Sequence, residues 1–176
     1  ANGAVYPDTS FGQHLRMVGQ LARLGIGLRA ATVDLGGWDT HESQAYGAGG
    51  TFGDLVGNLA GALAALYRDL DDGVADPLAS HLTVVVLTEF GRRVRENADR
   101  GTDHGHGFPI LVLGGSVNGG LYGSWPGLAP EALASVLRAA QPSLQLFRAE
   151  IEVDGTDASR SIMLLPHWLA VEMGWG

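Results

Sequence analysis

The stretch His81-Leu-Thr-Val-Val-Val-Leu-Thr88 decides the fold, because it is an unbroken apolar run rich in β-branched residues. Such a run predicts a strand that is buried on both faces, as in a parallel sheet. Two further runs predict a buried strand over Phe108–Leu113 and a short strand over Leu28–Val33 that ends at Asp34. Long segments separate these strands, which favours an α/β fold with right-handed crossovers.

One helix is predicted before the first strand and one between the first and second strands. Asp8-Thr9-Ser10 offers N-caps for a helix over Phe11–Leu24, and leucines at helical spacing predict a long helix over Thr51–Asp72. We expect a polar loop over Gly91–Gly107. After Gly120 the pattern weakens, and it predicts a short helix over Pro130–Ala139, a strand over Leu144–Val153 and a closing helix over Thr156–Glu172. Because no repeat or linker is visible, residues 1–176 are predicted to form a single α/β domain.

The amino-acid composition excludes several classes of function. The chain has 176 residues, 45% hydrophobic and 17% charged, which is typical of a globular domain with a substantial core. A net charge of -8 argues against a nucleic-acid partner. The absence of cysteine excludes disulfides, zinc–thiolate sites and thiol nucleophiles. No apolar run is long enough for a transmembrane segment. Ala1 begins no signal peptide, so we expect a processed product or a piece of a longer protein.

Polar residues gather in three segments beside the predicted strands: Asp34-Leu-Gly-Gly-Trp-Asp39-Thr-His41, Thr88-Glu89-Phe-Gly-Arg92 and Thr102-Asp103-His104-Gly-His106-Gly107. In open α/β sheets ligands bind beyond the carboxyl ends of the strands, so these segments should meet at one edge. Carboxylates and imidazoles are ligands of hydrolytic metal ions. The sequence therefore predicts a site for a divalent ion (zinc, manganese, magnesium or calcium) among Asp34, Asp39, His41, Glu89, Asp103, His104 and His106.

Structural roles for the same residues stay open. Asp34 before two glycines and Asp39-Thr-His41 both fit turns. Glu89, expected to be buried, needs either a metal or a neighbouring arginine such as Arg92. Asp103-His104-Gly-His106 also fits a solvated loop.

Arg92, Arg93 and Arg95 form a short basic run in an acidic chain. It is either a solvated face or an anion clamp, because the arginine fork matches phosphate, sulfate and carboxylate. We take Arg92 as the candidate catalytic residue. The glycine-rich segment Gly114–Gly120 has no lysine and does not fit a phosphate loop, and no serine-hydrolase elbow is present.

Taken in order, the three segments and the following Leu113-Gly-Gly-Ser-Val-Asn-Gly-Gly-Leu-Tyr-Gly123 resemble a large bacterial family known as domain of unknown function 1501. The resemblance covers roughly Phe11–Leu128. Members of the family are typically longer, often carry a twin-arginine export signal, and look like distant members of the alkaline phosphatase and sulfatase superfamily. The resemblance implies an alkaline-phosphatase-like, mostly parallel sheet flanked by helices, and a periplasmic or extracellular location.

The superfamily pattern also implies roles for single residues. Asp34 and Asp39 match its two metal carboxylates, and His41 is the nearest substitute for a histidine expected at Ser43. Glu89 stands at the next carboxylate position and Phe90 replaces a ligand histidine. The last ligand histidine is matched best by His106, with His104 as the alternative.

The superfamily nucleophile has no counterpart before Asp34, which implies that the chain is the C-terminal part of a longer domain. The resemblance thus implies an exported metal-dependent hydrolase of a small phosphate or sulfate ester, with little turnover by these residues alone. A missing N-terminal segment or a second copy of the chain would complete it. The alternative is a catalytically inactive binding domain of the cell envelope, with a glycan or a protein as its partner.

Overall fold

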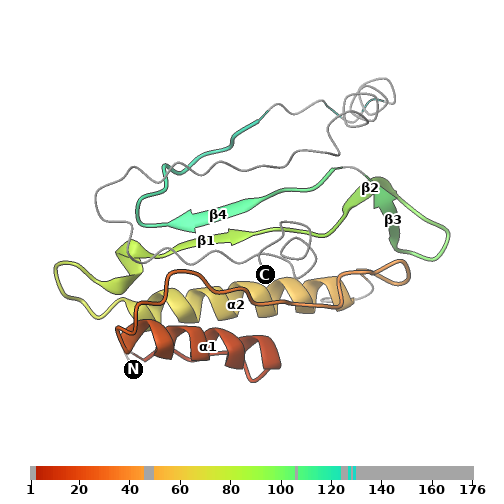
Figure 1. Ribbon diagram of the computed structural model, residues 1–176. Coiled ribbons are helices and arrows are strands. Elements are labelled where there is room, and N and C mark those ends of the chain that lie inside the picture. The colour runs from red at the N-terminus through yellow and green to blue at the C-terminus, as the bar shows by residue number, and fades with distance from the viewer. Residues whose placement is uncertain (1–2, 46–49, 106, 124–126, 128, 130–176) are drawn as a thin grey trace, which may run out of the picture.

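The computed structural model describes residues 3–45, 50–105, 107–123, 127 and 129 (Figure 1). In chain order the elements are α1 (Ser10–Arg23), α2 (Gly50–Leu70), the 3-10 helix η1 (Leu78–His81), β1 (Thr83–Val86), β2 (Gly91–Glu96), β3 (Thr102–Gly105) and β4 (Leu111–Gly114). The candidate ligand His106 and the elements predicted over 130–139, 144–153 and 156–172 lie outside the described residues.

The helices predicted over Phe11–Leu24 and Thr51–Asp72 are confirmed to within a few residues. Thr9 caps α1, since its side-chain oxygen accepts a hydrogen bond of 3.0 Å from the Gly12 backbone N–H. After α1 the chain turns at Gly25, whose φ of +62° is a conformation that glycine adopts without strain. Helix α2 carries its leucines at the predicted spacing, and Leu63, Leu66 and Leu70 are buried.

The prediction of a parallel sheet is wrong for the strands that form. β1 and β4 pair antiparallel, with Val84 opposite Leu113 and Val86 opposite Leu111. The reason is the connection between them: the segment 91–107, expected to be a loop, contains the β2–β3 hairpin, which also pairs antiparallel. A hairpin reverses the chain, whereas parallel strands need a long crossover. The coarse class of mixed helices and strands stands.

The segment Leu28–Val33 was expected to be a strand, but it forms none in the described part of the chain. It runs as an irregular segment, and Leu28, Ala31 and Val33 pack against the hydrophobic core. The segment therefore contributes apolar contacts to the core but no backbone pairing to a sheet.

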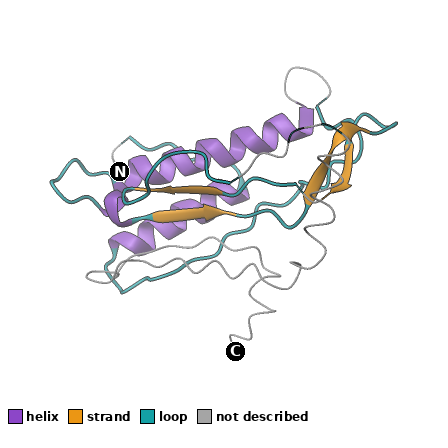
Figure 2. Ribbon diagram, turned by 90° about the horizontal axis from the view of Figure 1, so that it is seen from above, coloured by secondary structure: helices purple, strands orange, loops and turns teal. Residues whose placement is uncertain are grey.

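The core lies between the two helices and the β1–β4 sheet (Figures 1 and 2). Its buried members are Phe11, Leu15, Val18, Ala62, Leu63, Leu66, Leu70, Leu82 and Val84. Within it Asp69 is only 4% exposed, and it forms an ion pair with Arg23 and accepts a hydrogen bond of 3.0 Å from the Tyr6 hydroxyl. Strand β4 was expected to be buried but is exposed, because β1 is the strand of this sheet that contributes to the core.

Within the described residues, no helix combines the length and apolar character that crossing a membrane requires.

Candidate metal centre

The β2–β3 hairpin extends beyond the end of β1, at the right of Figure 1, and Asn97 shapes its turn. The Asn97 side-chain oxygen accepts hydrogen bonds from the backbone N–H of Asp99 at 3.0 Å and of Gly101 at 2.9 Å. Asparagine favours this role because its short side chain reaches backbone groups two to four residues ahead. Arg100 completes the turn with a φ of +61°.

The residues that follow the first polar segment dock onto this turn. Ser43 and Gln44 donate backbone hydrogen bonds of 2.9 Å to the carbonyls of Asp99 and Arg100. Gly101 is buried at the junction, where a Cβ atom would lie only 2.1 Å from the His41 carbonyl oxygen. Only a residue without a side chain allows that approach, so Gly101 lets His41 lie directly against the hairpin.

Three side chains converge at this junction. The Nε2 atom of His104 lies 2.7 Å from Oδ1 of Asp39, and Nε2 of His41 lies 2.9 Å from the same oxygen. One possible ligand atom from each of Asp39, His41 and His104 falls within 4.8 Å of the others. The hydrogen bond from His104, helped by the charges of His41 and Arg92, holds the pKa of Asp39 below its ordinary value. Asp39 is therefore an anion between two imidazoles at neutral pH.

Asp103 lies on the other side of the His41 ring, with Oδ1 at 3.2 Å from Nδ1. The same oxygen accepts a hydrogen bond of 3.1 Å from the Asn97 side-chain amide. These two contacts lower the pKa of the Asp103 carboxyl, and the hydrogen bond from Asn97 has the larger effect. Asp103 is thus a partner of His41 and lies outside the group of three.

Aromatic contacts fix the His104 ring. Phe90 stacks on it with ring centroids 4.1 Å apart and an interplanar angle of 18°. His41 lies on it at 4.8 Å with a tilt of 37°, and the Arg92 guanidinium sits 5.0 Å from the centre of the Phe90 ring. Phe90 therefore supports the orientation of the His104 ring.

Arg92 fastens the first segment to the hairpin. It donates to the carbonyl oxygens of Trp38 at 2.6 Å, Thr40 at 3.4 Å and Thr102, and its Nη2 atom lies 3.6 Å from Asp39 Oδ1. Most of its N–H groups are thus directed at groups of the chain itself. Its role as an anion clamp stays a prediction.

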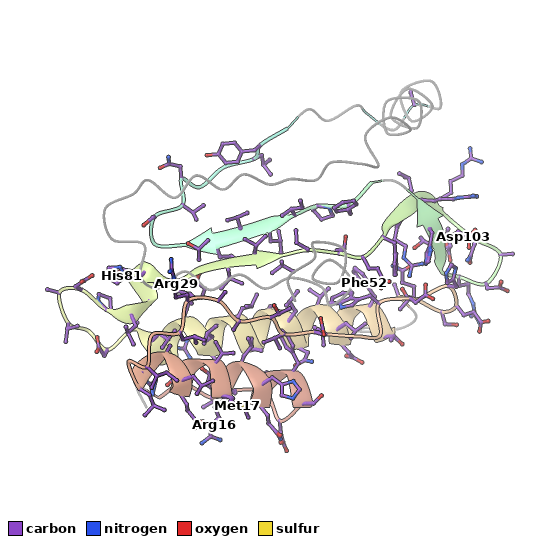
Figure 3. All side chains as sticks on the ribbon, viewed as in Figure 1. Arg16, Met17, Arg29, Phe52, His81 and Asp103 are labelled. Atoms are coloured by element: carbon purple, nitrogen blue, oxygen red, sulfur yellow. The ribbon has the colours of Figure 1, made fainter. Side chains whose placement is uncertain are left out.

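Among the described residues, two of the other predicted ligands lie outside the group of three. Asp34 and Glu89 are exposed, and neither joins it. Glu89 was expected to be buried, but β1 ends at Val86 and leaves it in a bend. His81 pairs with Asp76 at the opposite end of the molecule from Asp103 (Figure 3).

Sequence reasoning missed Asn97, although the segment Asn97-Ala-Asp-Arg-Gly101 carries the composition of a turn. That composition could have located the hairpin turn. It could not have shown that the Asn97 amide also contacts Asp103, because that contact depends on how the hairpin folds.

Comparison with known families gives one result. The family model described as "Protein of unknown function (DUF1501)" matches residues 5–142, which is most of the chain. No curated protein and no solved structure matches it.

Proposed function

The chain belongs to the DUF1501 family, and from that premise we propose that it binds one divalent metal ion through Asp39, His41 and His104. The observation that supports this proposal is the convergence of one carboxylate oxygen and two imidazole nitrogens within 4.8 Å. Carboxylates and histidines that approach so closely from segments far apart in sequence have the chemistry of a ligand set.

The donor set favours particular ions. Two imidazoles and one carboxylate suit zinc or manganese better than calcium or magnesium, which prefer shells made of oxygen. Three protein ligands also match the usual number in catalytic zinc sites, which keep further positions for water or substrate.

Access to the cluster supports a reactive site over a closed structural one. The side chains of Asp39, His41 and His104 are 64%, 40% and 49% exposed, so a substrate could reach all three. A divalent ion held there would supply polarisation of an ester oxygen and a lowered pKa of bound water. We therefore propose hydrolysis of a small phosphate or sulfate ester as the reaction class, in the periplasm or outside the cell.

Two hydroxyl groups near the cluster are engaged elsewhere. Thr40 is buried and its hydroxyl donates to the Trp38 carbonyl, while the Thr102 hydroxyl donates to the Gln44 side chain at 2.7 Å. Neither is presented as a nucleophile. We therefore propose water, and neither of these two hydroxyls, as the nucleophile of the hydrolysis.

Metal titration tests the proposal. The chain is freed of metal with a chelator and titrated calorimetrically with zinc and with manganese. We expect one ion per chain, and at least a tenfold loss of affinity in Asp39→Asn, which keeps the size of the side chain and removes its charge. Asp34→Asn is the matched control, since Asp34 is an exposed aspartate outside the cluster. Absence of stoichiometric binding, or equal losses in the two variants, would refute the proposed site.

A second candidate function, an inactive binding domain of the cell envelope, is favoured by two contacts. Phe90 stacks on His104 where the superfamily pattern has a ligand, and Arg92 is engaged with main-chain oxygens. If zinc binds but aryl phosphate and aryl sulfate esters are not cleaved by the zinc-loaded chain, this alternative gains support over the hydrolase.

A further inference from the structure

His41 contacts one carboxylate through each ring nitrogen. Its Nε2 atom lies 2.9 Å from Asp39, and its Nδ1 atom lies 3.2 Å from Asp103. A neutral imidazole carries only one N–H, so it can donate to only one of the two carboxylates. A ring nitrogen that carries the proton must lose it before it can bind a metal ion, so a lone pair already on Nε2 leaves His41 ready to act as a ligand.

The two carboxylates are not equivalent as acceptors. Oδ1 of Asp39 is already contacted by Nε2 of His104 at 2.7 Å and faces Arg92 at 3.6 Å. Oδ1 of Asp103 is instead held toward the His41 ring by the Asn97 amide. Asp103 is therefore the better placed acceptor for the single proton of His41.

The Asn97 amide has one orientation that satisfies all its neighbours. Its oxygen accepts from the N–H groups of Asp99 and Gly101, while its nitrogen donates to the His41 carbonyl at 2.9 Å and to Asp103 at 3.1 Å. A flipped amide would place like groups against each other at all four contacts. Asn97 thus ties both the backbone of His41 and the carboxylate of Asp103 to the hairpin turn.

From this chain of contacts we infer that Asp103, held by Asn97, is a positioning residue that keeps the proton of neutral His41 on Nδ1. The lone pair of Nε2 then faces Asp39 and His104. The inference rests on the proposed metal site and deepens it, because partners that orient a ligand histidine commonly contribute 10- to 100-fold in metal affinity, an order-of-magnitude range. It also separates Asp103 from the ligands with which the sequence grouped it.

The tautomer can be measured without any metal. We propose two-bond ¹⁵N–¹H correlation spectra of the ¹⁵N-labelled, metal-free chain at mildly alkaline pH, with His41 assigned by comparison with His41→Gln. Free histidine in water favours the proton on Nε2, so the expected Nδ1–H pattern for His41 is distinctive. An Nε2–H pattern in the unmodified chain would overturn the inference, and this result depends on no variant.

Variants then test the source of the preference. In Asp103→Ala, His41 should shift toward the Nε2–H form, and the zinc affinity should fall about 10- to 100-fold. Asn97→Asp is the second variant, and it should change both measurements in the same direction. It keeps the oxygen that caps the turn but replaces the donating amide with a group that repels Asp103. Asp99→Ala removes an exposed carboxylate from the same turn and should change neither measurement.

The two proposals fail in different ways. If Asp103→Ala keeps the Nδ1–H form and binds zinc as tightly as the unmodified chain, the positioning role is refuted while the metal site stands. If the unmodified chain binds no zinc, yet shows an Nδ1–H form that Asp103→Ala loses, the positioning role is supported and the proposed function is refuted.

Discussion

The Nε2 atom of His104 lies 2.7 Å from Oδ1 of Asp39, although 65 positions separate the two residues in the sequence. Both side chains are about half exposed or more, and contacts between exposed charged groups contribute little to stability. Their attraction alone would not hold two distant segments together. The contact is instead maintained by the residues around it, chiefly Arg92, Gly101 and Asn97, and each of these can be tested separately.

Arg92→Lys should loosen the first segment from the hairpin. A lysine has no planar fork and cannot donate to the carbonyls of Trp38, Thr40 and Thr102 at once. We expect the free energy of unfolding, measured by urea denaturation, to fall by about 2–3 kcal/mol. Arg93→Lys, at the exposed neighbouring position on β2, should change it by less than about 0.5 kcal/mol. Equal effects of the two substitutions would contradict the fastening role of Arg92.

Gly101→Ala should disrupt the junction itself. The added methyl group would lie 2.1 Å from the His41 carbonyl oxygen, so the backbone must move apart. We expect a loss of stability of about 1–3 kcal/mol, as for other overpacked sites, and weaker zinc binding.

The control for this substitution is Gly57→Ala on α2. A Cβ atom there meets nothing within 4 Å, so alanine should stabilise the helix by up to about 1 kcal/mol. Thermal unfolding of the two variants should therefore shift in opposite directions. A stability of Gly101→Ala equal to that of the unmodified chain would show that the junction is not tightly packed.

Ionisation of Tyr67 should lower the stability of the fold at alkaline pH. Its buried hydroxyl has no hydrogen-bond partner among the described residues, and burial raises its pKa from 10.0 to about 12. A raised pKa favours the neutral form in the folded state, so this contribution to stability is complete below pH 10 and is lost between pH 10 and about 12.

Tyr67→Phe should reduce that alkaline loss, leaving the part due to Tyr6, whose pKa burial also raises. At pH 8 the variant should be about 1 kcal/mol more stable, because a buried hydroxyl without a partner is costly. Tyr122→Phe, at an exposed tyrosine, is the control and should leave the profile unchanged. The profile of unfolding free energy against pH decides between these outcomes, and an unaltered alkaline loss in Tyr67→Phe would refute the assignment.

Local pattern predicted the helices well and the sheet poorly. The spacing of Leu63, Leu66 and Leu70 and the cap at Thr9 are properties of neighbouring residues, so the sequence displays them directly. Whether β1 and β4 run parallel or antiparallel depends on the connection between them. That connection contains the β2–β3 hairpin, and its polar composition predicted a loop instead of two paired strands.

For the candidate site, too, the sequence predicted which residue types are present but not how the fold arranges them. The three polar segments do meet, and Asp39, His41 and His104 were all among the predicted ligands. Spacing alone could not separate them from Asp34 and Glu89, because it does not show which side chains the β2–β3 hairpin brings together. The contacts of Asn97 and Phe90 became visible only once the hairpin had placed them beside the histidines.

The central claim is that Asp39, His41 and His104 hold one ion, and X-ray absorption at the zinc edge of the zinc-loaded chain tests it most directly. We predict nitrogen and oxygen ligands at about 2.0–2.2 Å, with the outer-shell scattering of two imidazoles. That scattering should fall to one imidazole in His104→Gln and stay unchanged in His81→Gln. A spectrum without imidazole scattering, or one that His104→Gln leaves unaltered, would contradict the account.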